Sequence, residues 1–115
     1  MKKENLYKTP FAKVYPYYVK KVENKGRSIT ELHQIIEWLT GYNEEQLQKH
    51  LSQQTNFEDF YNQANINANA HKIKGVVCGI KVEEIDDPLM QKLRYLDKLI
   101  DELAKGKTMD KILRT

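Results

Sequence analysis

The one thiol of this 115-residue chain, Cys78, lies in a glycine-flanked stretch, residues 75–79 (GVVCG). A cysteine becomes a nucleophile when a base and a positive environment stabilise its thiolate. His33, His50 and His71 are the candidate bases, but none has a spacing typical of a cysteine–histidine pair. A lone cysteine among valine and isoleucine residues is most often a small buried side chain. We therefore rank an enzyme that uses Cys78 third, behind an interaction protein and a nucleic-acid-contacting module.

The N-terminal segment alternates basic and aromatic side chains. Nucleic-acid bases stack on aromatic rings, while lysine and arginine contact phosphates. Residues 1–27 contain eight Lys or Arg and two Glu, whereas residues 28–70 contain one Lys and six acidic residues. The two regions could equally attract each other within the fold. If the segment binds nucleic acid, the predicted contacts are Lys13, Lys20, Lys21, Lys25, Arg27 and Tyr17.

Two further groups of side chains have metal-ligating chemistry. Four acidic residues stand close together at positions 83, 84, 86 and 87, and His33 and Glu37 are one helical turn apart. The acidic spacing matches no calcium loop, and the sequence shows no second pair of ligands that would complete a metal site with His33 and Glu37. The acidic residues are explained as a turn at a helix N-terminus, and His33 and Glu37 as a pair on the protein surface. We therefore predict no metal and no cofactor.

Composition is typical of a soluble globular protein, with 40% hydrophobic and 30% charged residues. No uncharged apolar run approaches the ~20 residues that cross a bilayer, so we predict no membrane association. One cysteine excludes an intramolecular disulfide and a cysteine-rich zinc site. We expect a single helical domain over residues 1–115 and a cytoplasmic location.

The elements that would position these residues are mostly helices. The strongest is a helix over residues 88–105, with Asp87 as N-cap, Pro88 at the first position, a leucine-rich stripe and Gly106 as its stop. Ser28 and Glu31 predict a capping box before a second helix, residues 28–40. We expect these two helices to form the core pair.

Shorter elements complete the prediction. Capping patterns at 43–46 and 55–58 predict two short helices, and Thr108 a final turn. The segment 9–24 predicts a turn capped by Thr9 and then a helix restarted or kinked by Pro16. The asparagine-rich stretch 65–70 is typical of a loop.

Residues 73–82 fit a helix face and an alternating strand about equally. Because nothing else in the chain resembles a partner strand, a helix or irregular segment is favoured over an extended one. The predicted fold class is all-α: a compact domain of about five to seven mostly short helices in a small orthogonal bundle, with 73–82 as the segment that could be extended.

Several of these stretches resemble a family of small bacterial proteins, the domain of unknown function 2200 family. The matching motifs are residues 11–16 (FAKVYP), 35–42 (IIEWLTGY), 75–79 (GVVCG) and 87–90 (DPLM) running on to 103–107 (LAKGK). The resemblance implies a compact, mainly helical cytosolic domain. It implies no activity, and no catalytic or binding residues can be inferred from it for this chain.

Structural signals account for nearly every marked residue, so the leading hypothesis is a non-enzymatic interaction or accessory protein. Its partner is unknown and can be a protein. A nucleic-acid-contacting module using the N-terminal segment comes second, and the Cys78 enzyme third. We expect any site to lie near the N-terminus of the 88–105 helix, where Gly79 and the acidic turn meet it.

Overall fold

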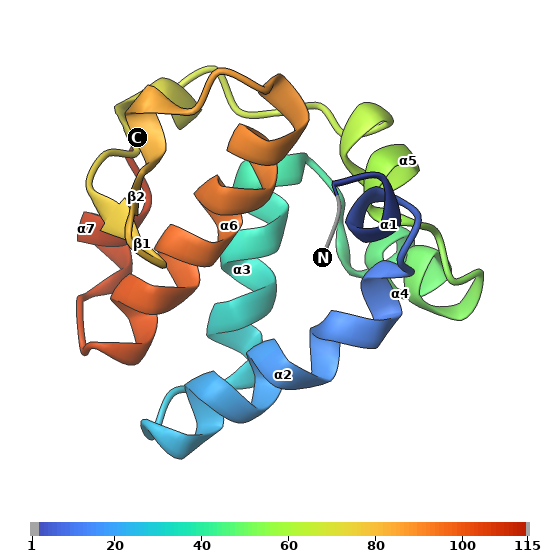
Figure 1. Cartoon of the computed structure of the whole chain (residues 1–115). Helices are drawn as coiled ribbons and strands as arrows, with labels where there is room; N and C mark the ends of the chain where they lie inside the picture. The colour runs from blue at the N-terminus through green and yellow to red at the C-terminus, as the bar shows by residue number, and fades with distance from the viewer. Residues whose placement is uncertain (1–2, 115) are drawn as a thin grey trace.

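Seven α-helices and one β-hairpin make up the regular structure of residues 3–114, the part of the chain that this computed structural model describes (Figure 1). The all-α prediction is therefore confirmed, with a two-stranded hairpin as a small addition. Two 3-10 turns, Ala70–Lys72 and Val82–Glu84, flank the hairpin. In chain order the elements are α1 (Lys3–Tyr7), α2 (Phe11–Asn24), α3 (Ile29–Thr40), α4 (Glu44–Ser52), α5 (Phe57–Asn62), β1 (Val76–Val77), β2 (Ile80–Lys81), α6 (Pro88–Ala104) and α7 (Met109–Ile112).

Helices α3 and α6 form the centre of the molecule, as the sequence predicts (Figure 1). Each buries the apolar stripe that its heptad-like spacing places on one side. Helix α2 packs against both, and α5 packs against α6. The fully buried side chains on the two central helices are Leu32, Ile35, Ile36, Leu39, Leu96, Leu99 and Leu103.

The predicted helix starts are largely confirmed. Asp87 accepts the backbone N–H of Leu89 at 3.0 Å and begins α6. Ser28 and Asn43 each form a complete capping box with the residue three positions on. These side chains accept N–H groups that have no partner inside the helix. At α5 the N-cap is Asn56, one residue later than the pattern at 55–58 predicts.

Of the two effects predicted for Pro16, a restart of the helix is wrong, because α2 is one helix that contains this proline. A proline removes one backbone hydrogen bond near the start of the helix, and the burial of Phe11 and Val22 holds both ends of α2 in place. Thr9 does not cap this helix; Pro10 does. Instead, the carbonyl of Thr9 accepts the N–H of Phe57 at 3.0 Å, which ties the start of α2 to α5.

The helix favoured for residues 73–82 is also wrong, and the extended alternative holds. Val77 pairs with Ile80 and Val76 with Lys81, so the segment is its own strand partner. The two residues of the turn, Cys78 and Gly79, both have positive φ (53° and 77°), as a type I′ turn requires. A two-residue strand is too short for its alternation to be recognised in a sequence.

The asparagine-rich loop docks on the end of α3. The N–H of Asn65 donates to the carbonyl of Thr40 at 2.9 Å, and that of Asn67 to the carbonyl of Leu39 at 3.0 Å. These carbonyls end a helix and lack a partner within it. Gly41 permits the approach, since a Cβ there would lie 3.2 Å from the Asn65 carbonyl oxygen.

Candidate functional site

A groove of about 1060 Å³ opens along the outer side of α3, and it is the candidate site. Helix α4 begins on one side of it, and the docked loop 65–68 forms the other. Its volume matches the upper range of ligand pockets in proteins. The lining residues are Ile29, Thr30, His33, Gln34, Glu37, Trp38, Gly41, Tyr42, Asn43, Glu44, Leu47, Asn65, Ile66, Asn67, Ala68 and Leu113.

The charged groups of the groove are acidic. Glu37 is exposed, and its carboxylate has neither a hydrogen bond nor an ion pair within residues 3–114. Glu44 accepts from Nδ1 of His33 at 2.8 Å. No lysine or arginine of the described chain lines the groove. An uncompensated carboxylate in a concave surface attracts a cation.

His33 links three helices by hydrogen bonds. Because a carboxylate can only accept, its Nδ1 donates to Glu44 at the start of α4, and Nε2 then accepts the hydroxyl of Tyr15 from α2. Burial, with the negative charges of Glu44 and Glu23, raises the pKa of the Tyr15 phenol. The arrangement fixes one wall of the groove and occupies both ring nitrogens of His33. The surface pair expected between His33 and Glu37 is not formed, because His33 pairs with Glu44 instead.

Trp38, the one tryptophan of the chain, supplies the largest flat surface in the groove. Its ring is partly buried against the core, and its indole N–H is enclosed with no acceptor among the described residues. A buried N–H without an acceptor costs about 1–3 kcal/mol. The groove therefore contains part of an aromatic side chain next to an unpaired carboxylate, while the indole N–H lies enclosed beneath the surface.

Five of the six predicted nucleic-acid contacts are exposed on or beside α2. Tyr17 is 72% exposed, more than any other large apolar side chain of the described chain. It lies one turn from each of two lysines along the same side of the helix. This outer stripe consists of Lys13, Tyr17, Lys20, Lys21 and Lys25.

Arg27 does not belong to the stripe, because its guanidinium is used within the fold. It forms a two-point ion pair with Glu31, at 2.7 Å and 3.2 Å, and donates to the carbonyls of Leu103 and Lys107. Hydrogen bonding to Arg27 and to the Ser28 backbone lowers the pKa of Glu31 to about 2. Arg27 thus joins the start of α3 to the end of α6.

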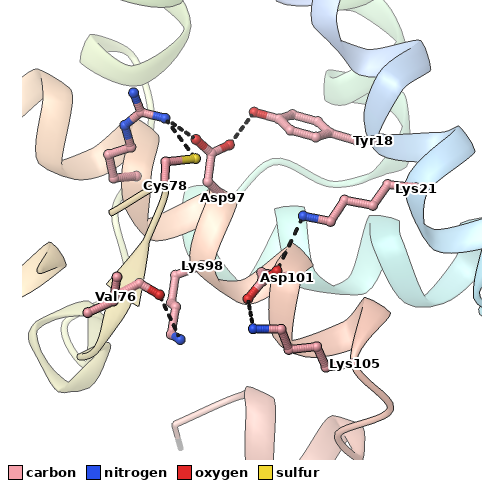
Figure 2. A network of polar contacts seen from close by, with 9 residues as sticks. Tyr18, Lys21, Val76, Cys78, Asp97, Lys98, Asp101 and Lys105 are labelled. Atoms are coloured by element: carbon pink, nitrogen blue, oxygen red, sulfur yellow. Dashed lines mark hydrogen bonds and ion pairs between the residues drawn. The ribbon is translucent and has the colours of Figure 1, made fainter. Parts of the chain in front are cut away.

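Cys78 is exposed at the tip of the hairpin rather than buried. Its Sγ lies 3.8 Å from Nη1 of Arg94, and Arg94 also donates to Asp97 at 2.9 Å. Figure 2 shows Tyr18 approaching the same carboxylate from α2. The three histidines have other partners: His33 as above, His50 with Thr55 and His71 with the carbonyl of Ala68. The structure therefore brings none of the candidate bases to the thiol.

The acidic turn before α6 is structural. Asp87 caps the helix and accepts the Tyr7 hydroxyl at 2.6 Å, and Glu83 accepts the N–H of Gly75 at 3.0 Å. Among the residues that the structure describes, no cluster of three or more metal-ligating side chains occurs.

The groove does not lie where the sequence predicts a site, near Gly79 and the start of α6. In the sequence, Trp38 appears only within the family motif 35–42, and the asparagines predict a plain loop. The one local signal for this site is the pair Glu37 and Trp38, a charge and an aromatic ring in the last turn of a helix that ends at Gly41. The concavity itself depends on how the loop docks, which no local pattern encodes.

Fold and groove together define a small all-α domain with a minor hairpin and a groove along α3. The chain belongs to the bacterial family described as "Uncharacterized protein conserved in bacteria (DUF2200)", whose profile matches residues 5–114. The resemblance seen in the sequence is thereby confirmed. The crystal structure of the uncharacterized protein SP1917 is similar, with a TM-score of 0.90 and 43% identity, over 97% of this chain and 93% of that one. None of the curated proteins matches.

These relatives carry no assigned activity, so they add no site residues. Within residues 3–114, no helix has the length and apolarity to span a bilayer.

Proposed function

We propose that this protein is a non-enzymatic interaction protein that binds a linear segment of a protein partner in the groove along α3. The single observation that carries the proposal is the groove itself: a hollow of about 1060 Å³ that contains Trp38 and an unpaired Glu37. Peptide-binding grooves combine apolar anchoring surface with a few polar groups that fix the orientation of the segment.

Side-chain amides strengthen this assignment. Gln34 and Asn65 line the groove, and their amides have no hydrogen-bond partner among the described side chains. An amide offers both a donor and an acceptor, which is what an incoming peptide backbone needs. The groove thus presents apolar surface, a charge and free backbone-binding groups within one concavity.

The test is selection of random linear peptides displayed on phage against three forms of the protein. We expect the wild type to enrich a recurrent sequence and Gln34→Tyr, which replaces one of the groove's amides by a bulkier ring, to lose it. Asn62→Tyr is the matched control, because Asn62 is exposed on α5 outside the groove. Absence of enrichment, or enrichment that survives Gln34→Tyr, would contradict the proposal.

The α2 stripe supports a second candidate function, contact with nucleic acid. The supporting observation is the 72% exposed ring of Tyr17 among Lys13, Lys20 and Lys21. Stacking on an exposed ring contributes about 1–3 kcal/mol per base. Lys21 also pairs with Asp101 at 3.4 Å, as Figure 2 shows, so part of its charge is already used.

Fluorescence anisotropy with a single-stranded RNA tests this second function. Binding should weaken with rising salt and fall when Lys20→Ala and Lys21→Ala are combined, since phosphate contacts release counterions. The double variant Lys72→Ala/Lys74→Ala, exposed on another part of the chain, should bind like the wild type. No binding at low salt would end this hypothesis.

We further propose that the protein works in the cytoplasm. The exposed free thiol of Cys78 supports this location, because a reducing compartment keeps such thiols reduced.

A further inference from the structure

The chemistry of the groove identifies the class of segment that it would take, an inference that rests on the proposed function. Glu37 and Glu44 are its carboxylates; Glu44 accepts from His33 and from the amide of Gln48, whereas the Glu37 carboxylate has no partner among the described residues. The protein as a whole carries a net charge of +3, so its overall field repels a cation. A basic segment would therefore be attracted by the groove and not by the surface in general.

Apolar groups stand within reach of these carboxylates. Ile29 is 39% exposed at one end of the groove, and the partly buried rings and chains of Trp38, Ile66 and Leu113 line its length. Exposed aliphatic and aromatic surface gains about 25 cal/mol per Å² on burial. The face of an indole also attracts a lysine or arginine that lies over it.

We propose that the groove binds a basic linear segment of a partner protein, with an aliphatic side chain packed beside Trp38 and a lysine or arginine paired with Glu37. The free amides of Gln34 and Asn65 then bond its backbone. Charge on the segment gives selectivity, and the apolar anchor gives most of the affinity.

Three synthetic peptides of equal length test the proposal. All carry leucine at the same positions, and the remaining positions hold lysine in the first, glutamine in the second and glutamate in the third. Trp38 is the only tryptophan of the protein, so its fluorescence reports occupancy of the groove directly. We expect the lysine peptide to bind at least about tenfold more tightly than the glutamine peptide, a difference of about 1.4 kcal/mol. The glutamate peptide should bind more weakly than either.

Two variants distinguish attraction of the lysine peptide by the groove carboxylate from its electrostatic attraction to the protein surface in general. Glu37→Gln should weaken the lysine peptide by about fivefold and leave the glutamine peptide unchanged. Glu45→Gln is the matched control, because Glu45 is exposed next to Glu44 but does not line the groove. Equal binding of the lysine and glutamine peptides, or equal weakening by both variants, overturns the proposal.

The proposed function and this inference fail separately. If phage selection enriches a groove-dependent sequence that is neutral or acidic, the groove binds peptides and only the basic class is wrong. If selection enriches nothing that Gln34→Tyr removes, the proposed function itself fails. Binding of the lysine peptide without a change in Trp38 fluorescence, with equal affinity for Gln34→Tyr, places the contact elsewhere and contradicts both.

Discussion

The ion pair between Arg27 and Glu31 does several tasks at once. Glu31 completes the capping box of α3 through the N–H of Ser28 at 3.0 Å, and it holds the guanidinium that reaches the end of α6. A carboxylate that accepts this many donors is stabilised in its charged form. The same residue therefore couples a local helix start to a contact far away in the chain.

We predict that Glu31→Gln lowers the free energy of unfolding at pH 7 by about 1–2 kcal/mol, less than the pKa shift alone implies because solvent screens the pair. The folded-state pKa is about 2, below the unfolded value, so the contribution is present above about pH 5 and is lost as the pH falls toward 2. Urea unfolding of both proteins across this range measures it. A difference that stays constant from pH 7 to pH 2 would contradict the assignment.

Capping residues were the most predictable single positions. Ser28, Asn43 and Asp87 each act through neighbours two or three positions away, so a short sequence window contains the whole interaction. Arg27 was not predictable in the same way. Its main partners outside α3 are carbonyls near residue 105, and no local pattern distinguishes such an arginine from a free one.

The N-cap residue of α6, Asp87, also attaches helix α1 to the start of α6. Asp87 accepts backbone N–H groups of the first turn through one carboxylate oxygen and the hydroxyl of Tyr7 through the other. Burial and this bond raise the pKa of Tyr7 to about 12. Helix α1 is thereby fastened to the N-terminus of α6.

We expect Asp87→Ala to lower the unfolding free energy by about 1–2 kcal/mol and Tyr7→Phe by about 0.5–1.5 kcal/mol. The effects should be less than additive, because both changes remove the same bond. Thermal and urea unfolding of the two single variants and the double variant measure this. Asp86→Ala, an exposed neighbour, is the control and should change stability by under about 0.5 kcal/mol.

Long helices with clear ends could be predicted from the sequence, and short paired elements could not. The apolar stripe of α6 repeats over four turns, so the pattern predicts a helix even where a single turn alone would not. The hairpin offers two residues per strand, and α2 tolerates a proline because tertiary burial of Phe11 and Val22 outweighs its cost. The groove was missed for a related reason, since it arises between α3, α4 and a loop rather than within any of them.

Aromatic packing joins two helices that are distant in the sequence, α2 and α5. The ring of Phe11 stacks on Phe60 with centroids 4.1 Å apart and meets the edge of Phe57 at 6.0 Å. All three are buried. This cluster fixes α2 against α5, in the same region where Thr9 and Phe57 are bonded through their backbones.

Phe11→Ala should therefore lower the unfolding free energy by about 3–5 kcal/mol, a large part of the about 5–15 kcal/mol typical of a domain. Circular dichroism during urea unfolding measures the change. Tyr17→Ala, on the same helix but exposed, should shift the midpoint very little. If the two substitutions cost the same, the aromatic cluster does not have the role assigned to it.

The docking of the asparagine-rich loop on α3 also decides where this chain can be lengthened. Composition suggests that residues 65–70 would accept inserted sequence, yet Asn65 and Asn67 are bonded to Thr40 and Leu39, and an insertion between them would pull the loop off the helix end. The turn at Gly26 is exposed, and a side chain added there meets no neighbour within 4 Å. However, the N–H of Arg27 donates to the carbonyl of Val22 at 2.9 Å across this turn, so an insertion there should disturb the end of α2 and the contacts of Arg27. An insertion among the asparagines should instead open the wall of the groove.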